Sequence, residues 1–196
     1  MRTFVILFFF FVTGCSNTGS DKNAKSNDPA AELIDIPANA IREKFADQPG
    51  MEKITIKDAS GFLSAEGTVV NGQKEGVWTE FNTNGTLKRV TPFVNGKKEG
   101  WYAELNDNGQ FVKRILYHND LRHGDYKEFN YSTLKEERYY QNDKLEGPVK
   151  IYYDNGKVME EGSYKNGTRD GVSRWFDQEG KMTIEYTYKD GQLVKK

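Results

Sequence analysis

Residues 76–100 read GVWTEFNTNGTLKRVTPFVNGKKEG, and this stretch contains one complete copy of the unit that builds the chain. Two turn signals divide it, Asn84-Gly85 and Asn95-Gly96, about eleven residues apart. Asn-Gly pairs supply the positive φ angles that tight hairpin turns need. The segments between the turns are rich in aromatic and β-branched residues and are too short for helices. The stretch therefore predicts strand, turn, strand, turn.

The same unit recurs along the chain with a period of about 24 residues. Five glycines mark the period and lie 24, 24, 23 and 24 residues apart: Gly76, Gly100, Gly124, Gly147 and Gly171. Apolar residues keep the same phase, in one row of Phe81, Leu105, Phe129, Tyr152 and Phe176 and another of Phe93, Tyr117, Tyr140, Tyr164 and Tyr188. We interpret the five glycines as structural turn residues. Residues 51–196 are therefore predicted to be all-β, an elongated antiparallel β-meander of tandem hairpins with five clear units and a degenerate sixth around Gly61 and Asn71-Gly72.

The third unit lacks a glycine in its first turn. Where the first unit has Asn82-Thr83-Asn84-Gly85, the third has Asn130-Tyr131-Ser132 and is one residue shorter. Turns tolerate changes of length, and the aromatic residues on both sides stay in phase. We therefore expect the hairpin to persist across the deletion.

Composition supports a thin sheet rather than a thick core. Hydrophobic residues make up 36% of the 196 residues and aromatic residues 13%, and all tyrosines and tryptophans lie from Trp78 onward. A polar chain that concentrates its apolar area in aromatic residues suits a half-exposed sheet. The formal net charge of −1 gives no general attraction to phosphate, so nucleic acid is not expected as a partner.

The start of the chain has the pattern of an export signal. One positive charge precedes an unbroken apolar run from Phe4 to Val12, which is too short to span a membrane but fits a signal peptide over residues 1–14. Val12-Thr13-Gly14-Cys15 resembles the lipobox of bacterial lipoproteins, in which the cysteine becomes the lipidated first residue of the mature chain. The resemblance implies a membrane anchor at Cys15 and a place in the cell envelope. Ser16 resembles the arrangement that directs Gram-negative lipoproteins to the outer membrane, and a secretory signal with an incidental cysteine is the alternative.

Residues 15–50 are predicted to connect this anchor to the repeats. Ser16 to Asp35 is polar and has almost nothing to bury, so we expect a disordered tether. Residues 37–45, PANAIREKF, predict a short helix with Ile41 and Phe45 four residues apart, and Pro49-Gly50 would end it. We expect this helix to cap the open edge of the first hairpin.

The repeating unit resembles the MORN-repeat variant found in YwqK-like proteins. Its pattern of Gly-x-Trp-x-x-Phe-x-x-Asn-Gly, an aromatic residue and Asn-Gly-x-x-Glu-Gly is complete in residues 76–100 and well kept in residues 154–171. Trp78 gives way to Tyr102, Tyr126, Val149 and Ser173 in the later units. The resemblance covers residues 52–196 and implies an elongated β-sheet that works by binding. The YwqK-like family takes its name from antitoxin or immunity partners of secreted toxins, but an exported copy cannot neutralise a toxin in its own cytoplasm.

The sequence contains no arrangement that is typical of an active site. His118 and His123, the only histidines, flank a turn without a cysteine or acidic partner at the spacing of a zinc site, so we interpret them as turn residues. The Asp-Asn-Gly segments at 107–109 and 154–156 lack the closing glutamate of a calcium loop and fit hairpin turns. Residues 171–175 lack the last glycine of a nucleophile elbow, and no phosphate-binding glycine loop is present. We expect a protein that is not an enzyme and that uses no metal or cofactor.

The favoured function is a protein-interaction scaffold in the cell envelope, because large aromatic residues at partly exposed positions often anchor interfaces. The alternatives are an immunity protein that captures a toxin and a module that binds carbohydrate or cell wall through stacked aromatic rings. The same aromatic residues would alternatively cover the apolar rows of the sheet itself. The candidate partner-binding residues are Trp78, Trp101, Tyr102, Tyr126 and Trp175.

Overall fold

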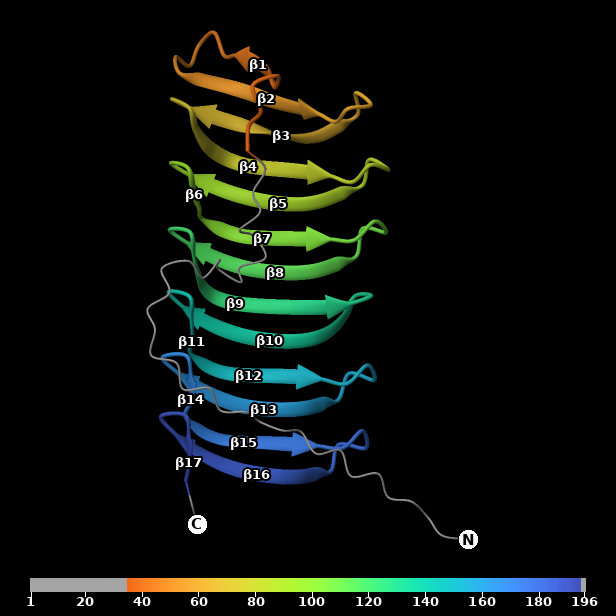
Figure 1. Cartoon of the computed structure of the whole chain (residues 1–196), viewed down its shortest axis with the longest axis vertical. Coiled ribbons are helices and arrows are strands. Elements are labelled where there is room, and N and C mark those ends of the chain that lie inside the picture. Colours follow the sequence, from red (N-terminus) through yellow and green to blue (C-terminus); the bar gives the residue numbers. More distant parts are fainter. Residues whose placement is uncertain (1–34, 195–196) are drawn as a thin grey trace. The chain divides into compact units, whose positions relative to one another are not determined.

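The computed structural model describes residues 35–194, and within these residues it contains strands and no helix. Seventeen strands form one open antiparallel sheet, whose hairpins follow one another like the rungs of a ladder (Figure 1). The predicted all-β meander of tandem hairpins is therefore confirmed. Cys15 and nearly all of the predicted tether lie outside the described residues. The strands are β1 (Ile41–Lys44), β2 (Met51–Lys57), β3 (Leu63–Val70), β4 (Gln73–Phe81), β5 (Leu87–Val94), β6 (Lys97–Lys98), β7 (Gly100–Leu105), β8 (Phe111–His118), β9 (Leu121–Asn130), β10 (Thr133–Gln141), β11 (Lys144–Leu145), β12 (Gly147–Tyr152), β13 (Val158–Lys165), β14 (Thr168–Arg169), β15 (Gly171–Phe176), β16 (Met182–Lys189) and β17 (Gln192–Leu193).

Two kinds of turn alternate, and each kind occupies its own edge of the ladder. Two-residue turns form the turn edge, on the left of Figure 1, and Asn95 and Gly96 in the first of the clear units have φ angles of 49° and 79°. Paired positive φ angles match the twist of the strands that they join. Five-residue loops form the loop edge, on the right, at residues 58–62, 82–86, 106–110, 153–157 and 177–181. The loop at 58–62 shows that the degenerate unit is a complete hairpin.

The third unit replaces its five-residue loop by a two-residue turn. Tyr131 and Ser132 have φ angles of 47° and 68°, and Asn130 pairs directly with Thr133. The hairpin persists, as expected from the sequence. Its cost is that two residues with side chains adopt the left-handed conformation that glycine adopts more easily.

The five periodic glycines lie in the strands just beyond the turn edge, so their interpretation as turn residues is wrong in detail. Between the pairs Phe93↔Lys98 and Val90↔Ala103, two residues of β5 face four residues of the next strand. The extra residues form a bulge, and its glycine takes a positive φ angle that a side chain disfavours. The φ angles are 68° at Gly76, 103° at Gly100, 109° at Gly124, 73° at Gly147 and 109° at Gly171.

The predicted short helix over residues 37–45 is also wrong. A turn closed by the N–H of Ala40 and the carbonyl of Pro37 leads instead into β1, which pairs with β2 from Ile41↔Thr55 to Lys44↔Glu52. The edge of β2 offers a row of backbone partners, whereas the helix had one apolar pair to stabilise it. The segment covers the edge of the first hairpin, as expected, but it does so as a strand.

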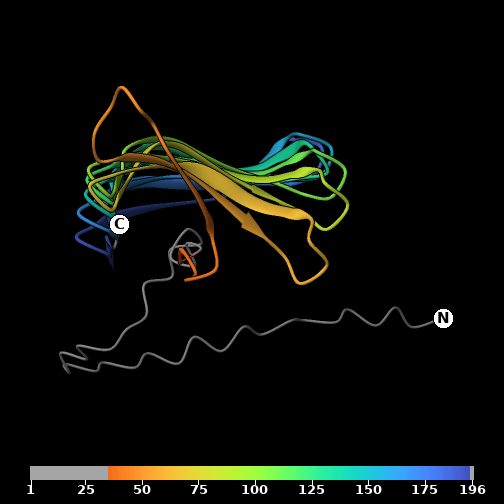
Figure 2. The same ribbon diagram turned by 90° about the horizontal axis from the view of Figure 1, so that it is seen from above.

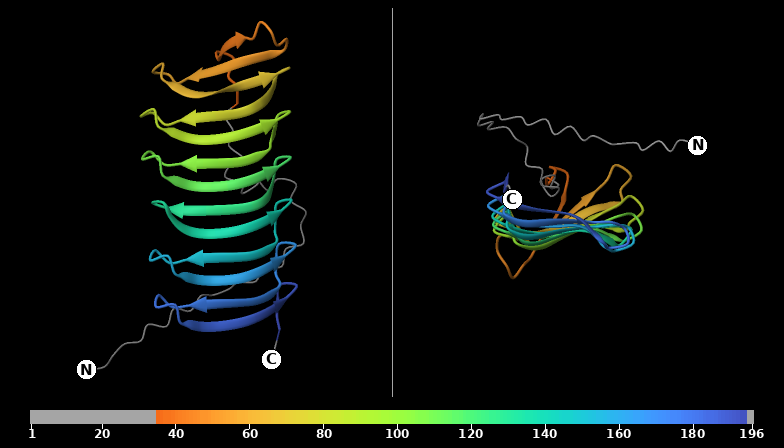
Figure 3. Two further views of the ribbon diagram at one scale, coloured as in Figure 1. Left: turned by 180° about the vertical axis from the view of Figure 1, so that it is seen from behind. Right: turned by 90° about the horizontal axis from the view of Figure 1, so that it is seen from below.

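Successive hairpins lie over one another when the ladder is seen along its length (Figure 2). Views from behind and from below show the same stacking (Figure 3). Because side chains alternate between the two faces of a strand, residues in equivalent positions form rows along the ladder. In the first of these rows the indole of Trp78 lies on Gly67, where an added Cβ would come within 2.2 Å of the ring, and its Nε1 donates to the carbonyl of Thr68 at 2.9 Å.

The bulge glycines differ in what a side chain would meet, and this difference can be tested. At Gly124, with φ near 109°, an added Cβ would lie 2.7 Å from Cδ2 of Leu116, whereas at Gly76 it would meet nothing within 4 Å. We expect Gly124→Ala to lower the free energy of unfolding by about 2 kcal/mol or more and Gly76→Ala by about 1 kcal/mol. Urea unfolding of both variants measures the difference. Equal losses would mean that the backbone angle alone matters.

Candidate functional site

The sheet has an aromatic face, which is buried, and an outer face, which is not. Register places Trp78 opposite Thr91, Tyr102 opposite Ile115 and Tyr126 opposite Arg138 on one side of the sheet, the aromatic face. Only 4% of Trp78, none of Tyr102 and 8% of Tyr126 is exposed. The expectation that these three residues are partly exposed partner-binding positions is wrong. They cover the apolar rows of the sheet itself.

Basic side chains pack over the rings of the aromatic face. Lys98 is buried with its Nζ 4.2 Å from the ring centroid of Tyr117, and the guanidinium of Arg122 lies 4.2 Å from that of Tyr140. Long side chains with a charged end cover apolar surface well, and their charge is attracted to the π face. Lys98 and Arg122 therefore take part in the packing of this face.

Carboxylates on the aromatic face are held by partners within the sheet. Glu80 is buried and lies 3.0 Å from the guanidinium of Arg89. Burial raises the pKa of the Glu80 carboxyl, and the Arg89 charge opposes this rise. The hydroxyl of Tyr102 donates to Glu104 at 3.2 Å, and that of Tyr126 to Glu128 at 2.7 Å, while burial raises the pKa of both tyrosines. These pairs stabilise the sheet from within the aromatic face.

Trp175 lies on the same face at its less covered end. Its Nε1 donates to Glu160 at 2.9 Å, and its ring lies 5.4 Å from the guanidinium of Arg169 and 6.0 Å from the ring of Tyr186. The residue is half-buried rather than exposed. Its contacts are those of a core residue, so the structure gives it no clear role in binding a partner.

An apolar stripe runs along the outer face, next to the turn edge. Register places Val77 opposite Pro92, Trp101 opposite Leu116, and Pro148 and Val172 in the same row. The exposed fraction is 58% for Val77, 43% for Trp101, 40% for Tyr139 and 38% for Val172, although all belong to regular strands. Trp101 is thus the predicted candidate that the structure leaves on the surface. The outer stripe consists of Val77, Pro92, Trp101, Leu116, Tyr139, Pro148 and Val172, and Asp125, opposite Tyr139, interrupts it in the third unit.

The outer stripe borders a hollow and a row of paired charges. The hollow, of about 280 Å³, is lined by residues that include Lys127, Glu137, Tyr139 and Pro148. Further along the same face Arg174 bridges Glu161 and Glu185, with N···O distances of 3.1 and 2.8 Å. Alternating charges on neighbouring strands neutralise each other. The stripe is therefore an apolar surface beside a polar border without strong net charge.

A carboxylate clamp joins the turn of four of the five clear units to the unit before it, at the turn edge. The acidic residue that precedes a bulge glycine accepts a hydrogen bond from the first backbone N–H of the next turn. Sequence reasoning missed this role, although the recurring acidic residue before the glycine was visible. The clamps are Glu75 with Asn95 at 2.8 Å, Glu99 with Asn119 at 2.9 Å, Glu146 with Asn166 at 2.8 Å and Asp170 with Asp190 at 3.3 Å.

This geometry of tandem hairpins agrees with the comparison with known families. Three segments of the chain, residues 74–95, 145–166 and 169–190, match the MORN repeat variant. The chain contains MORN-variant repeats. The units between the matched segments, built on β7–β8 and β9–β10, continue the same antiparallel register. A search of curated proteins found no match.

The described part of the MORN-variant repeat array contains neither a metal-binding group of three or more side chains nor a spanning helix. In residues 35–194, no group of three or more His, Cys, Asp or Glu side chains is arranged to hold a metal ion. Across the same residues, no helix has the length and apolar character needed to cross a membrane. The outer stripe is a surface feature of these repeats in which large apolar side chains stay exposed on regular strands.

The carboxylate clamps predict how the MORN-variant repeats respond to acid. Hydrogen bonds from His118 and from the N–H of Asn119 hold the pKa of the Glu99 carboxyl below its ordinary value of 4.5, and those from Lys189 and Asp190 hold the pKa of Asp170 below 3.8. Their stabilising contribution is therefore present above these ordinary values and is lost as pH falls through the lower, folded-state values.

We expect the double variant Glu99→Gln/Asp170→Asn to lose less stability than the wild type between about pH 6 and about pH 3, since neither replacement titrates. Denaturant unfolding at a series of pH values measures the slopes. Glu179→Gln, at the loop edge, should keep the wild-type slope. A double variant with the wild-type slope would contradict a role for the clamps in acid sensitivity.

Proposed function

We propose that this chain is a non-enzymatic, lipid-anchored scaffold of the bacterial cell envelope that binds another protein through its outer stripe. The observation that carries the proposal is the exposure of Val77, Trp101, Tyr139 and Val172 on regular strands of one face. Exposed apolar side chains gathered on one face beside a polar border are typical of sites where proteins associate. The resemblance to YwqK-like repeat proteins, which work by binding, supports the same conclusion.

The environment of Trp101 favours a protein partner over a sugar. The guanidinium of Arg114 lies 4.9 Å from the centroid of its ring and so covers one side of the indole. A sugar would need an open ring face on which to stack, whereas a protein can pack against the exposed edge of the indole and against Val77 and Leu116 on the neighbouring strands. Tryptophan and arginine together are frequent at the centres of protein interfaces.

A photo-crosslinking amino acid at Trp101 or Val172 should give one discrete protein adduct in cells, because both positions belong to the same stripe. The matched control is the same probe at Tyr131, which is 75% exposed but lies at the loop edge. Gel analysis and mass spectrometry of the adducts identify the partner. An identical adduct pattern from Tyr131, or no adduct from either stripe position, would contradict the proposal.

Loss of the stripe should weaken capture of that partner without unfolding the repeats. We expect Val77→Ser/Trp101→Ser to reduce the yield of the Val172 adduct about tenfold or more, since central interface aromatics commonly contribute this much. The variant should keep wild-type thermal stability, because the aromatic face is untouched. A glycan that binds the wild type and not this variant would instead favour the carbohydrate-binding alternative.

The anchor has its own test. The apolar run from Phe4 to Val12 and the small residues before Cys15 support export and lipidation at that cysteine. Metabolic labelling with a palmitate analogue should mark the wild type and not Cys15→Ser. The variant should also leave the membrane fraction, because it lacks the acyl chains that together anchor the wild type. Equal labelling of both proteins would refute an anchor at Cys15.

A further inference from the structure

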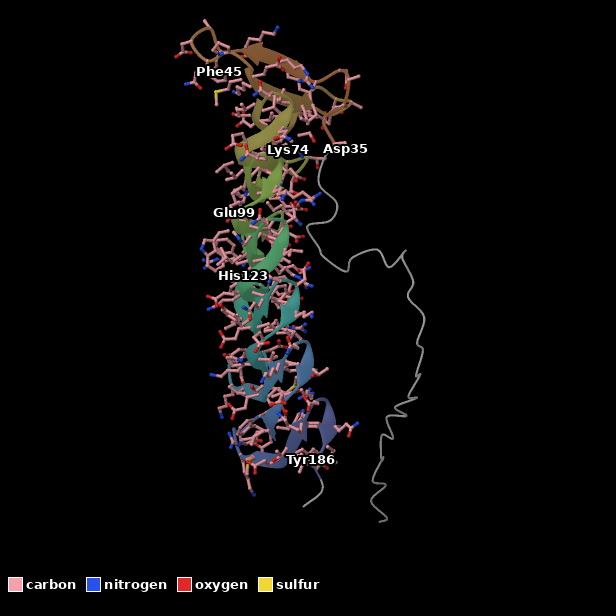
Figure 4. The ribbon with its side chains drawn as sticks, turned by 90° about the vertical axis from the view of Figure 1, so that its left-hand side faces the viewer. Asp35, Phe45, Lys74, Glu99, His123 and Tyr186 are labelled. Carbon is pink, nitrogen blue, oxygen red and sulfur yellow. The ribbon has the colours of Figure 1, made fainter. Side chains whose placement is uncertain are left out.

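The only two histidines of the sequence meet on neighbouring strands at the turn edge. His118 ends β8 and His123 lies near the start of β9, and their ring centroids are 5.8 Å apart with an angle of 74° between the planes. Figure 4 shows His123 and Glu99 on the same side of the ladder, in neighbouring units. The interpretation of both histidines as turn residues accounts for their place in the chain but not for this contact.

His123 departs from the structural role of its position in the repeat. The equivalent residues in the other clear units are the clamp carboxylates Glu75, Glu99, Glu146 and Asp170, each of which accepts a hydrogen bond from the next turn. The imidazole instead places its Nδ1 3.1 Å from the Oδ1 of Asn142. The third unit thus has an imidazole where the other clear units have a clamp carboxylate, and this imidazole lies beside the second histidine.

Both rings are oriented in the way that metal-binding imidazoles usually are. Nδ1 of His118 lies 2.9 Å from Oε1 of Glu99, and Nδ1 of His123 lies against the amide oxygen of Asn142. An oxygen acceptor requires the proton on Nδ1, so each neutral ring carries its lone pair on Nε2. A carboxylate or carbonyl oxygen that accepts from the far nitrogen is the common outer layer of a histidine metal site.

The distance between the rings is close to that of a chelate. Two imidazoles that share one ion through Nε2, with metal–nitrogen bonds of about 2.0–2.1 Å and a tetrahedral angle, have centroids about 5.3 Å apart. The observed 5.8 Å differs little from this value, and the His118 side chain is 56% exposed. Asn119, whose Nδ2 lies 3.0 Å from Nε2 of His118, is also exposed and can turn away.

We propose that His118 and His123 form a two-imidazole site for a divalent transition metal ion such as Zn²⁺, Ni²⁺ or Cu²⁺, with Glu99 and Asn142 orienting the rings. Neutral imidazoles select these ions over Mg²⁺ and Ca²⁺, which prefer oxygen ligands. Water would fill the remaining coordination positions, which leaves the ion open to an additional ligand. The site lies on the outer face, two residues beyond the stripe residue Leu116 on β8, but it uses no stripe side chain, so its test is independent of the proposed scaffold function.

Titration of the purified full chain with Zn²⁺, Ni²⁺ or Cu²⁺ tests the site by isothermal calorimetry and by NMR of the imidazole nitrogens. We expect one ion per chain and shifts confined to Nε2 of the two rings. His118→Gln and His123→Gln should each weaken binding at least tenfold, and Glu99→Gln about tenfold, the usual effect of losing a residue that orients a ligand. Gln141 occupies the repeat position equivalent to His118, so His118→Gln places there a residue that the fold already contains.

Glu146→Gln is the matched control, because it removes the carboxylate of an equivalent clamp without touching an imidazole. It should keep wild-type affinity for the metal. Absence of saturable binding to the wild type would overturn the proposal. So would binding that survives both His118→Gln and His123→Gln in variants whose circular dichroism shows an intact sheet.

Discussion

Every unit of this sheet depends on the one before it for the hydrogen bonds of its turn. The N–H of Gly96 donates to the carbonyl of Lys74 at 2.9 Å, and that of Gly167 donates to the carbonyl of Leu145 at the same distance. The clamp carboxylate accepts the neighbouring N–H of the same turn. In an isolated hairpin the backbone N–H groups of the two-residue turn would bond only to water, and such a hairpin is marginally stable. Stability therefore arises between units, as in other repeat proteins.

The aromatic face shows how a single-layer sheet makes a core from unequal residues. In the first clear unit the large indole of Trp78 lies on a glycine, so one bulky residue fills the space of two. In the last clear unit Ser173 occupies the position equivalent to Trp78, and it too lies against a glycine, Gly162. Nη1 of Arg169 donates to the hydroxyl of Ser173 at 3.0 Å. The guanidinium of Arg169 also lies near Tyr164, Trp175 and Tyr188. The row stays filled because a cation replaces the ring that the sequence has lost.

The period and the turn residues made the hairpins predictable from the sequence. They did not predict on which face of the sheet each side chain lies. Asn-Gly and Asn-Asp turns repeat in phase, so strand order and the position of the degenerate unit follow from the sequence. Trp101 and Tyr102, however, are adjacent and both aromatic, and alternation separates them without telling which one is buried. The bulge determines which of the two is buried, because the extra residues beyond each turn set which side chains of the strand point to the aromatic face. No rule of composition locates such a bulge before its register is known.

The same bulge connects the core to the surface that the proposed function uses. On the outer face an ideal Cβ on Gly100 would lie 3.4 Å from Cγ of Pro92, and Gly124 likewise makes room for Leu116 of the preceding unit. Residues of the outer stripe thus lie against the glycines that let the aromatic face close. The stripe residues Val77 and Trp101 themselves remain exposed and contribute little to that closure. A sheet built in this way is held mainly by its aromatic face, which leaves Val77 and Trp101 on the outer face available for the contact that we propose.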